Sequence, residues 1–349
     1  MKQFFTTTLL IILFVACKEN GSKIQPVSTG KFGEAFVIID QDLLTDGLRS
    51  TLHQAFERPQ MLYGGEEPYF KLIYLTPSQA KGSLIYEGTN LIITHSGMKS
   101  DVRRLLPPKI DSMVTLRKRE GIHTVLKEDV WSSPQEVLFV LGDNVDSIRA
   151  FIQEHSDEFL AKMLKMERKE AVGRMTALPN QKIRKEILDK HQIDIKAPIS
   201  YHIAANSKFG NGQGFIWLRN ADVEYDLNLV VHYEPYTDTS QFQLDSLIAR
   251  RDSVEKRFIS GDVKGSYMAT DTQFPYFTTT TDFNGHFARE YNALWTMKKD
   301  FMGGPYYSIT VLDEAHKRLI TMEGFVFAPS KEKTSYLREL QGIIYGITF

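Results

Sequence analysis

Cysteine is almost absent from this chain, in which Cys17 is the only one among 349 residues. A single cysteine excludes an intramolecular disulfide and leaves no second thiolate for a structural zinc site. The nine histidines are scattered, and none stands in an H-E-x-x-H pair or another common ligand spacing. We therefore expect neither a metal ion nor a bound cofactor.

Strong charge of one sign is also missing. Lys and Arg number 42 against 43 Asp and Glu, so the formal net charge is -1. Without a basic excess, the chain is not expected to bind nucleic acid. After residue 16, no run of apolar residues is long enough for a transmembrane helix. The composition, 42% hydrophobic and 24% charged, is that of a globular protein, and the length favours two domains.

The chain lacks the common signatures of catalysis. No G-x-S-x-G elbow is present, and the S-x-x-K pattern occurs without its companion S-D-N and K-T-G motifs. The glycine-rich stretch KFGNGQGF at 208–215 leads into an apolar strand, which favours a hairpin over a phosphate-binding loop. These absences favour a non-enzymatic binding or assembly protein. The alternative is a hydrolase whose carboxylate or serine site is not visible in the sequence.

The N-terminus, in contrast, carries a clear pattern. Lys2 precedes an apolar run at 4–16, which would span about 20 Å as a helix and is too short for the roughly 30 Å hydrocarbon core of a membrane. This arrangement predicts a cleaved signal peptide over residues 1–16.

The run FVAC at 14–17 resembles the lipobox of bacterial lipoproteins. The resemblance implies cleavage before Cys17 and acyl chains on this residue, which would bind the protein stably to a membrane. Lys18 after the cysteine favours the outer membrane, and leaves open whether the protein faces the periplasm or the cell surface. Residues 17–32 are polar and contain Gly, Ser and Pro, so we expect a flexible tether.

Residues 33–172 are predicted to form an N-terminal α+β unit. Short apolar runs predict strands, and apolar residues at steps of three and four predict helices. The predicted strands cover 34–40, 69–75, 90–95 and 137–142, and the predicted helices cover 43–56 and 145–163. Asp143 or Asn144 can cap the second of these helices.

A charge-rich stretch at 173–197 contains Gly173 and Pro179, and we expect a helical connector there. Residues 198–349 are predicted to form a second α+β unit. Its predicted strands cover 214–220, 225–234 and several pieces of 267–328, and its predicted helices cover 244–258 and 336–347.

Both units share the order of strand, helix, several strands and helix. The sequence therefore predicts an α+β protein of two similar halves, with mostly antiparallel sheets and helices packed on one face. The similar patterns at 137–152 and 324–340 suggest an internal duplication, although the residue identity between them is too low to decide.

The most unusual local composition is FPYFTTTTDFNGHFARE at 274–290, where aromatic residues and threonines alternate. Such a strand can present a surface for a glycan or a peptide. The contacts would be Tyr276, Phe277, Phe283 and Phe287. Strand propensity alone is the competing explanation, because Thr, Tyr and Phe all favour sheets.

Several stretches are distinctive when taken together. They lie at 66–70, 130–144, 215–220, 251–271, 297–309 and 322–347. With the lipobox and the length, they resemble an uncharacterised lipoprotein family of Bacteroidota, the domain of unknown function 4837 family. The resemblance implies an exported, membrane-anchored envelope protein, and it implies no activity, cofactor or catalytic residue. We therefore expect an envelope lipoprotein that binds a protein partner or a glycan.

Overall fold

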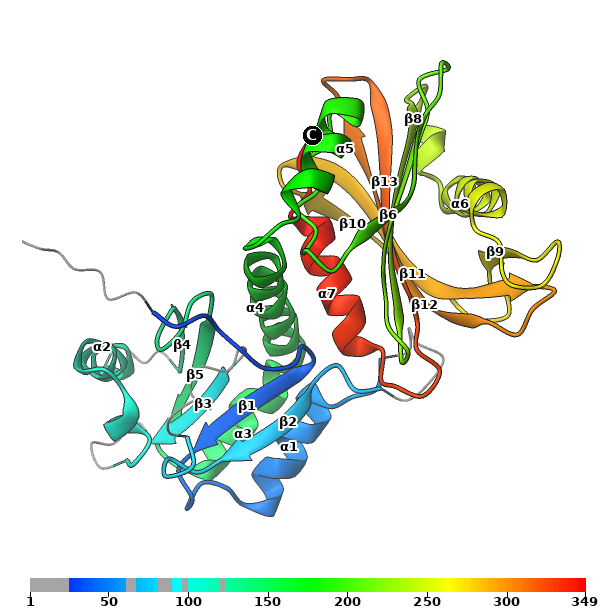
Figure 1. Ribbon diagram of the computed structural model, residues 1–349. Coiled ribbons are helices and arrows are strands. Elements are labelled where there is room, and N and C mark those ends of the chain that lie inside the picture. The colour runs from blue at the N-terminus through cyan, green and yellow to red at the C-terminus, as the bar shows by residue number, and fades with distance from the viewer. Residues whose placement is uncertain (1–24, 61–66, 81–89, 96–99, 120–122) are drawn as a thin grey trace, which may run out of the picture.

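A computed structural model describes residues 25–60, 67–80, 90–95, 100–119 and 123–349. The chain forms two domains, each built around its own β-sheet (Figure 1). Cys17 and the signal peptide predicted over residues 1–16 lie outside the described residues. No helix within these ranges is both long and apolar enough to cross a membrane.

The N-terminal domain contains a five-stranded sheet in the order β2-β1-β3-β5-β4. Its strands are β1 (Glu34–Ile39), β2 (Lys71–Leu75), β3 (Asn90–His95), β4 (Thr124–Glu128) and β5 (Glu136–Gly142). The pairings of β1 with β2, β1 with β3 and β3 with β5 are parallel, whereas β4 runs antiparallel to β5. Every residue of β5 is buried, as expected for a strand covered on both faces.

Helices cover both faces of this sheet. Its helices are α1 (Asp46–Phe56), α2 (Pro108–Arg119), α3 (Val145–Glu154) and α4 (Ser156–Thr176), with a short 3-10 turn η3 (Arg103–Leu105) before α2. The first, third and fourth helices pack on one face, and α2 packs on the other. The side chain of Asn144 accepts a hydrogen bond from the backbone N of Ser147 and so caps α3. The cap predicted at Asp143 or Asn144 is thus confirmed at Asn144.

The C-terminal domain contains an eight-stranded antiparallel sheet in the order β10-β11-β12-β13-β8-β7-β6, with β9 paired to β11. Its strands are β6 (His202–Lys208), β7 (Gly214–Ala221), β8 (Asp226–Pro235), β9 (Tyr267–Thr270), β10 (Phe277–Phe283), β11 (His286–Lys298), β12 (Gly303–Asp313) and β13 (Arg318–Phe327). Its helices are α5 (Gln181–His191), α6 (Leu244–Phe258) and α7 (Thr334–Tyr345), with a 3-10 turn η4 (Thr239–Phe242) before α6.

The two faces of this sheet follow the alternation of side chains along each strand. On β8, Leu229 and Val231 contribute to the core under α5 and α7, whereas Val230 contributes to the core under α6. Figure 1 shows α6 on one side of the sheet and α5 and α7 on the other. The hairpin predicted at 208–215 is confirmed as the connection between β6 and β7.

The α+β class and the two halves are confirmed. One finer expectation is wrong, because helices cover both faces of each sheet. Most strand pairs are antiparallel, as predicted, but the N-terminal sheet is largely parallel. A short apolar run reports burial but not the direction of its partner strand, so the pattern could not give this result. The two sheets differ in strand order and direction, and therefore the similar sequence patterns are not a repeat of one topology.

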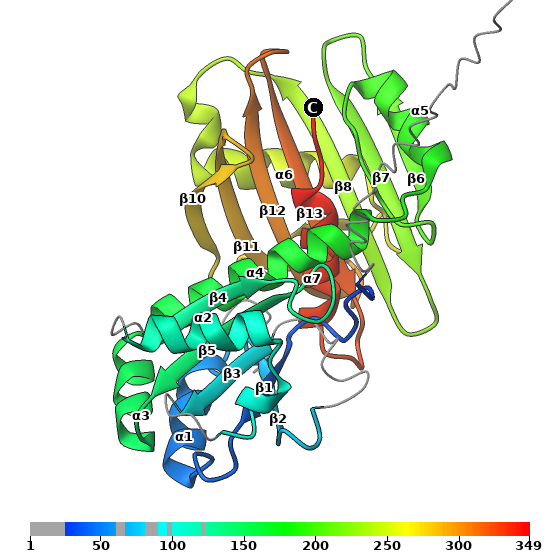
Figure 2. The same cartoon turned by 90° about the vertical axis from the view of Figure 1, so that its left-hand side faces the viewer.

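The domains meet where α4 crosses α7, which lie side by side in both views (Figure 2). Gly342 permits this close crossing, because a Cβ added there would lie 2.7 Å from the backbone C and O atoms of Ala171. Any larger residue would force the helices apart.

Carboxylates of the N-terminal domain also bind the C-terminal domain. The buried Glu167 of α4 accepts from the backbone N of Gly33 at 2.5 Å and pairs with Arg338 Nε at 3.0 Å. Glu67 accepts from the backbone N of Thr334 at 2.9 Å and thereby caps α7 from the other domain. The two domains therefore share a polar as well as an apolar junction.

Residues 26–32 pack against the N-terminal domain, although the tether was predicted to continue to residue 32. Ser28 Oγ donates to Glu170 Oε1 at 2.7 Å. Phe32 is 5% exposed, and the guanidinium of Arg174 lies 4.2 Å from its ring centroid. Polar composition alone suggested a flexible segment, but these contacts fix its second half.

Candidate functional site

A pocket of about 370 Å³ opens on the α6 face of the C-terminal sheet. It is bounded by β7, β8, β11 and β13 and by the loop after α6. Odd-numbered residues of β7 and β11 and even-numbered residues of β8 point to this face, because the register of the antiparallel pairs aligns them. The sheet therefore assembles the pocket from segments that are distant in sequence.

The floor of the pocket is aromatic and rich in methionine. Its side chains are Trp217, Met268, Trp295, Met297, Met302, Phe325 and Phe327. Trp295 and Met268 are almost fully buried, whereas Trp217 and Phe327 are half-buried and more open to solvent. An apolar floor of this kind suits a ligand group that loses water on binding.

Both indole N–H groups on this floor are satisfied inside the domain. Trp217 Nε1 donates to Asn228 Oδ1 at 2.8 Å, and Trp295 Nε1 donates to the carbonyl oxygen of Val326 at 3.2 Å. The indoles therefore offer ring surface to the pocket rather than hydrogen-bond donors. Glycine at position 304 leaves room for the hydrogen bond between Trp295 and Val326, because a Cβ added there would lie 2.2 Å from the same Val326 oxygen.

Acidic side chains dominate the mouth of the pocket. The lining carboxylates are Asp222, Glu224, Asp226 and Asp262. Arg219 and Asp226 form a bidentate pair, with Nε–Oδ1 at 2.9 Å and Nη2–Oδ2 at 2.6 Å. This pair raises the pKa of Arg219 above its usual range, and Asp262 acts in the same direction. Glu224 is paired with Lys331 at 2.9 Å, so Asp222 and Asp262 give the rim its net negative charge.

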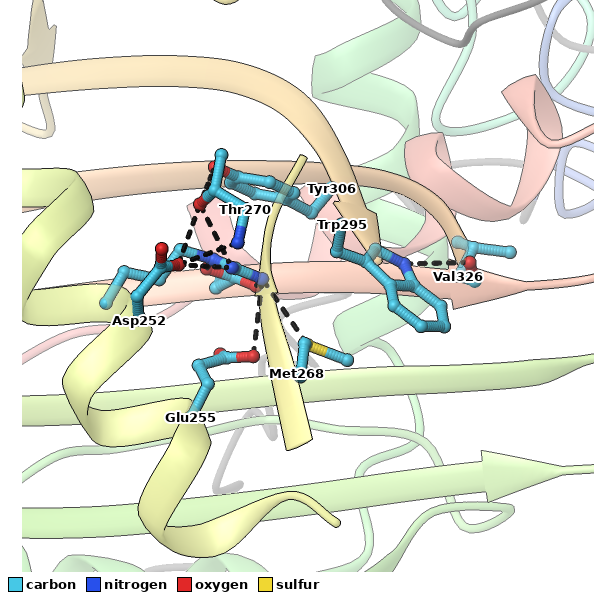
Figure 3. A network of polar contacts seen from close by, with 9 residues as sticks. Asp252, Glu255, Met268, Thr270, Trp295, Tyr306 and Val326 are labelled. Atoms are coloured by element: carbon cyan, nitrogen blue, oxygen red, sulfur yellow. Dashed lines mark hydrogen bonds and ion pairs between the residues drawn. The ribbon is translucent and has the colours of Figure 1, made fainter. Parts of the chain in front are cut away.

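A buried ionic network lies next to the floor of the pocket (Figure 3). Arg251 of α6 donates from Nε and Nη2 to the two carboxylate oxygens of Glu323 on β13, both at 2.7 Å. Its Nη2 also lies 3.2 Å from Glu255 Oε2 and 3.4 Å from the sulfur of Met268. All three ionic side chains are 1% exposed. The network holds α6 on the sheet and supports the floor through Met268.

The charge balance of this network follows from its burial. Burial raises the pKa of Glu255 well above its usual range, and it also raises the pKa of Glu323. Arg251 also pairs with Asp252 at 3.2 Å, but that carboxylate is partly exposed and is further bound by Thr270. The two fully buried carboxyl groups share one guanidinium, so the state of lowest energy keeps a proton on Glu255 and the charge on Glu323. The trio formed with Arg251 is then neutral.

The part of the chain that holds this pocket matches a known family model. Residues 180–346 match a domain of unknown function, DUF4837. The C-terminal half belongs to the DUF4837 family. Residues 28–176 match a second domain of unknown function, DUF8532. Comparison with curated proteins gives no match. The pocket and the ionic network thus lie within the DUF4837 domain, and the DUF8532 domain joins it through α4.

The aromatic surface predicted at 274–290 is not one surface of the DUF4837 domain. In the register of β10 and β11, Phe283 pairs with His286 and Asp282 pairs with Phe287, which places the two phenylalanines on opposite faces. Phe283 is 1% exposed and lies in the core under α7, so it cannot contact a ligand at the surface.

The other three predicted contacts lie at the surface but separately. Phe287 is 54% exposed and packs edge-on against Phe242, with ring centroids 5.0 Å apart. Tyr276 and Phe277 are 38% and 41% exposed. Phe277 shares the strand parity of the buried Phe283 and not of Phe287. Together they form no recess comparable to the pocket beside α6.

The pocket residues were not expected from the sequence. Trp217 was assigned to the strand at 214–220, and its alternation with Ile216 and Leu218 already indicated a face of its own. Trp217 and the charged Arg219 lie on the same half-buried face of one strand, and this pairing is the signal in the sequence that could have indicated a pocket there. Its partners Met268 and Trp295 lie far along the chain, and only the sheet brings them together.

A second polar cluster lies at the end of β1 in the DUF8532 domain. Asp40 accepts from Ser100 Oγ at 2.5 Å, from Thr94 Oγ1 at 3.1 Å and from the backbone N of Val102 at 3.1 Å. Asp40 is 4% exposed, so its carboxylate binds Ser100 and Val102 rather than facing solvent. No group of three His, Cys, Asp or Glu side chains suited to a metal ion occurs within the described part of the chain.

Proposed function

We propose that this protein is a membrane-anchored binding protein, whose DUF4837 pocket takes an apolar side chain of a partner protein next to a basic residue. The observation that carries the proposal is an apolar floor enclosed by a rim with excess carboxylate. The anchor is the lipid predicted on Cys17, and it rests on the sequence.

The chemistry of the floor favours a side chain over a sugar. Three of its residues are methionines, whose flexible and polarisable thioethers adapt to different apolar groups. Both indole N–H groups are occupied within the domain, so the floor presents few donors for sugar hydroxyls. A volume of about 370 Å³ lies at the small end of ligand pockets and suits one or two side chains.

The rim favours a positive neighbour for that side chain. Asp222 and Asp262 form no ion pair with a basic residue that lines the pocket, and they would attract a Lys or Arg beside the apolar group. Such long-range attraction mainly speeds association and selects the partner, and salt weakens it.

Two hairpin tips at the mouth extend the apolar surface. Val223 lines the pocket and is 100% exposed, and Phe301 precedes the lining Met302 and is 107% exposed. Large apolar side chains fully exposed beside a pocket are typical of a surface that a partner protein covers.

Short peptides test the binding proposal. Acetylated hexapeptides with a central Leu flanked by Lys, Gln or Glu would be titrated by isothermal calorimetry at low and high salt. We expect the Lys-flanked peptide to bind at least about tenfold more tightly than the Glu-flanked one, with the difference reduced at high salt. Equal affinities would contradict the role of the rim. Saturable binding of neutral oligosaccharides, with no peptide bound, would favour a glycan ligand instead.

Matched variants locate the binding. Asp262→Asn should weaken binding of the Lys-flanked peptide several-fold, because the substitution removes one negative charge from the rim. Asp189→Asn removes the same charge from α5, where the residue pairs with Lys185 on the opposite side of the sheet, and should have no effect. Equal losses in both variants would show a non-specific charge effect.

Replacement of the cysteine tests the anchor. Cys17→Ser should abolish labelling by radioactive palmitate and leave the protein outside the membrane fraction after carbonate washing. Unchanged labelling would refute lipid attachment at this residue.

A further inference from the structure

A second pocket, of about 290 Å³, opens on the same face of the DUF4837 sheet. Its apolar walls are Phe209, Phe215 and Phe258, and the rings of the last two stack with centroids 4.0 Å apart. Phe215 precedes Trp217 on the same face of β7, so the two pockets are neighbours along that strand. The acidic rim residues of the first pocket do not line the second.

The charge of this second pocket is reversed. Arg250 and Arg257 line it with one carboxylate, Glu234. Arg250 Nη1 donates to Glu234 Oε1 at 2.7 Å, which neutralises that pair. The guanidinium of Arg257 lies 4.8 Å from the ring centroid of Phe209, and within the described ranges it forms no ion pair with a carboxylate. An arginine that rests on aromatic rings keeps its N–H fork available for a bidentate contact.

A buried polar atom also lacks a partner there. His232 lines the pocket and is 5% exposed, and its Nε2 has no hydrogen-bond partner among the described residues. Burial, with Arg250 and Arg251 nearby, lowers the pKa of His232 to about 3, so the ring is neutral. A buried ring nitrogen without a hydrogen-bond partner destabilises the fold, and a ligand group that bonds to it would remove that penalty.

We propose that this pocket binds a small organic anion, with its carboxylate or phosphate on Arg257 and its apolar body against the phenylalanine side chains that line the pocket. Ser253 and Gln213 also line the pocket and supply further polar contacts, and the ring nitrogen of His232 meets a polar atom of the body. The excess guanidinium selects an anion, and the aromatic walls select an apolar body over an inorganic ion. This site is independent of the peptide pocket proposed above.

Three probes of similar size separate these contributions. Phenylacetate, phenyl phosphate and neutral 2-phenylethanol would be titrated into the full-length protein by calorimetry, with inorganic phosphate as a competitor. We expect at least one of the two anions to bind about tenfold more tightly than the alcohol, and the tighter anion tells carboxylate from phosphate. Equal affinity of the alcohol, or no binding of either anion at millimolar concentration, would overturn the proposal.

Two neighbouring variants provide the control. Arg257→Gln should weaken binding of the preferred anion about tenfold or more, because the substitution removes the charged guanidinium group. Lys256→Gln makes the same change of charge one residue away, on a side chain that lies over Tyr267 and does not line the pocket. The affinity of the Lys256→Gln variant for the preferred anion should stay within about twofold of that of the parent protein. Equal losses of affinity in the two variants would overturn the proposed site. Both residues are exposed, so neither substitution should unfold the protein.

Discussion

Replacing Arg251 with Met should destabilise the DUF4837 domain strongly near neutral pH and far less in mild acid. Arg251 is the one cation in a trio of side chains that are each 1% exposed, and it donates two hydrogen bonds of 2.7 Å to Glu323. Met has a similar length and fills most of the same space without a charge. The substitution therefore removes the counter-charge and leaves most of the apolar packing.

The magnitude follows from the proton that Glu323 must then bind. Glu255 already holds a proton, because burial raises its pKa well above the ordinary value. Without Arg251, Glu323 must also become neutral, although its ordinary pKa is 4.5. Protonating it requires about 3.4 kcal/mol at about pH 7 and about 0.7 kcal/mol at about pH 5, at 1.36 kcal/mol per unit. Lost hydrogen bonds add about 1–3 kcal/mol at either pH.

Urea unfolding, followed by far-UV circular dichroism, measures this effect. The difference between variant and parent should reach about 4–6 kcal/mol near neutral pH and shrink by roughly 2.7 kcal/mol in acid. Arg251→Met combined with Glu323→Gln provides the control, since the neutral amide needs no proton and the pH dependence should vanish. A loss of stability that is the same at both pH values, or no recovery in the double variant, would refute the charge argument.

Three further predictions concern the junction and the core. Gly342→Ala should destabilise the protein by about 1–3 kcal/mol and separate the unfolding of the two domains, as seen by calorimetry, because the new Cβ would lie 2.7 Å from Ala171. Burial raises the pKa of Glu170 to about 7, so between about pH 4.5 and about pH 7 the folded chain binds more protons at this group than the unfolded chain does. The free energy of unfolding should therefore fall as the pH rises through this window. Glu170→Gln should flatten that fall in urea titrations. Phe283→Ala should destabilise by about 3–5 kcal/mol, and Phe287→Ala by under about 1 kcal/mol, in the same assay, because only the first ring is in the core.

Elements with a strong local signal were predictable from the sequence. The run at 137–142 became β5, and Asn144 caps the helix that follows, because a capping side chain acts on a backbone only three residues away. The stripe predicted at 336–347 became α7, which is buried almost throughout. Each of these features depends on neighbours in the sequence and can be recognised without a fold.

Features that depend on strand register were not predictable. Phe283 and Phe287 look equivalent in an alternating stretch, yet the short turn between them puts one in the core and the other on the opposite face. Likewise, Trp217 and Trp295 meet on one pocket floor only because β7, β8, β13, β12 and β11 are neighbours in that order. A pattern along one segment contains no information about which distant segment will lie beside it.

One face of the DUF4837 sheet carries the junction with the other domain, and the opposite face carries the two pockets. Helix α7 is buried on two sides, because Leu340 and Ile344 pack on the sheet while Gly342 and Arg338 contact α4 of the other domain. Both pockets lie on the α6 face, and all the described residues that line them belong to the DUF4837 domain. Docking of the DUF8532 domain on the α6 face would bury Trp217 and Arg257 and leave α7 exposed. The membrane anchor proposed at Cys17 would therefore leave the α6 face open to the proposed ligands, provided that the junction at α7 stays rigid.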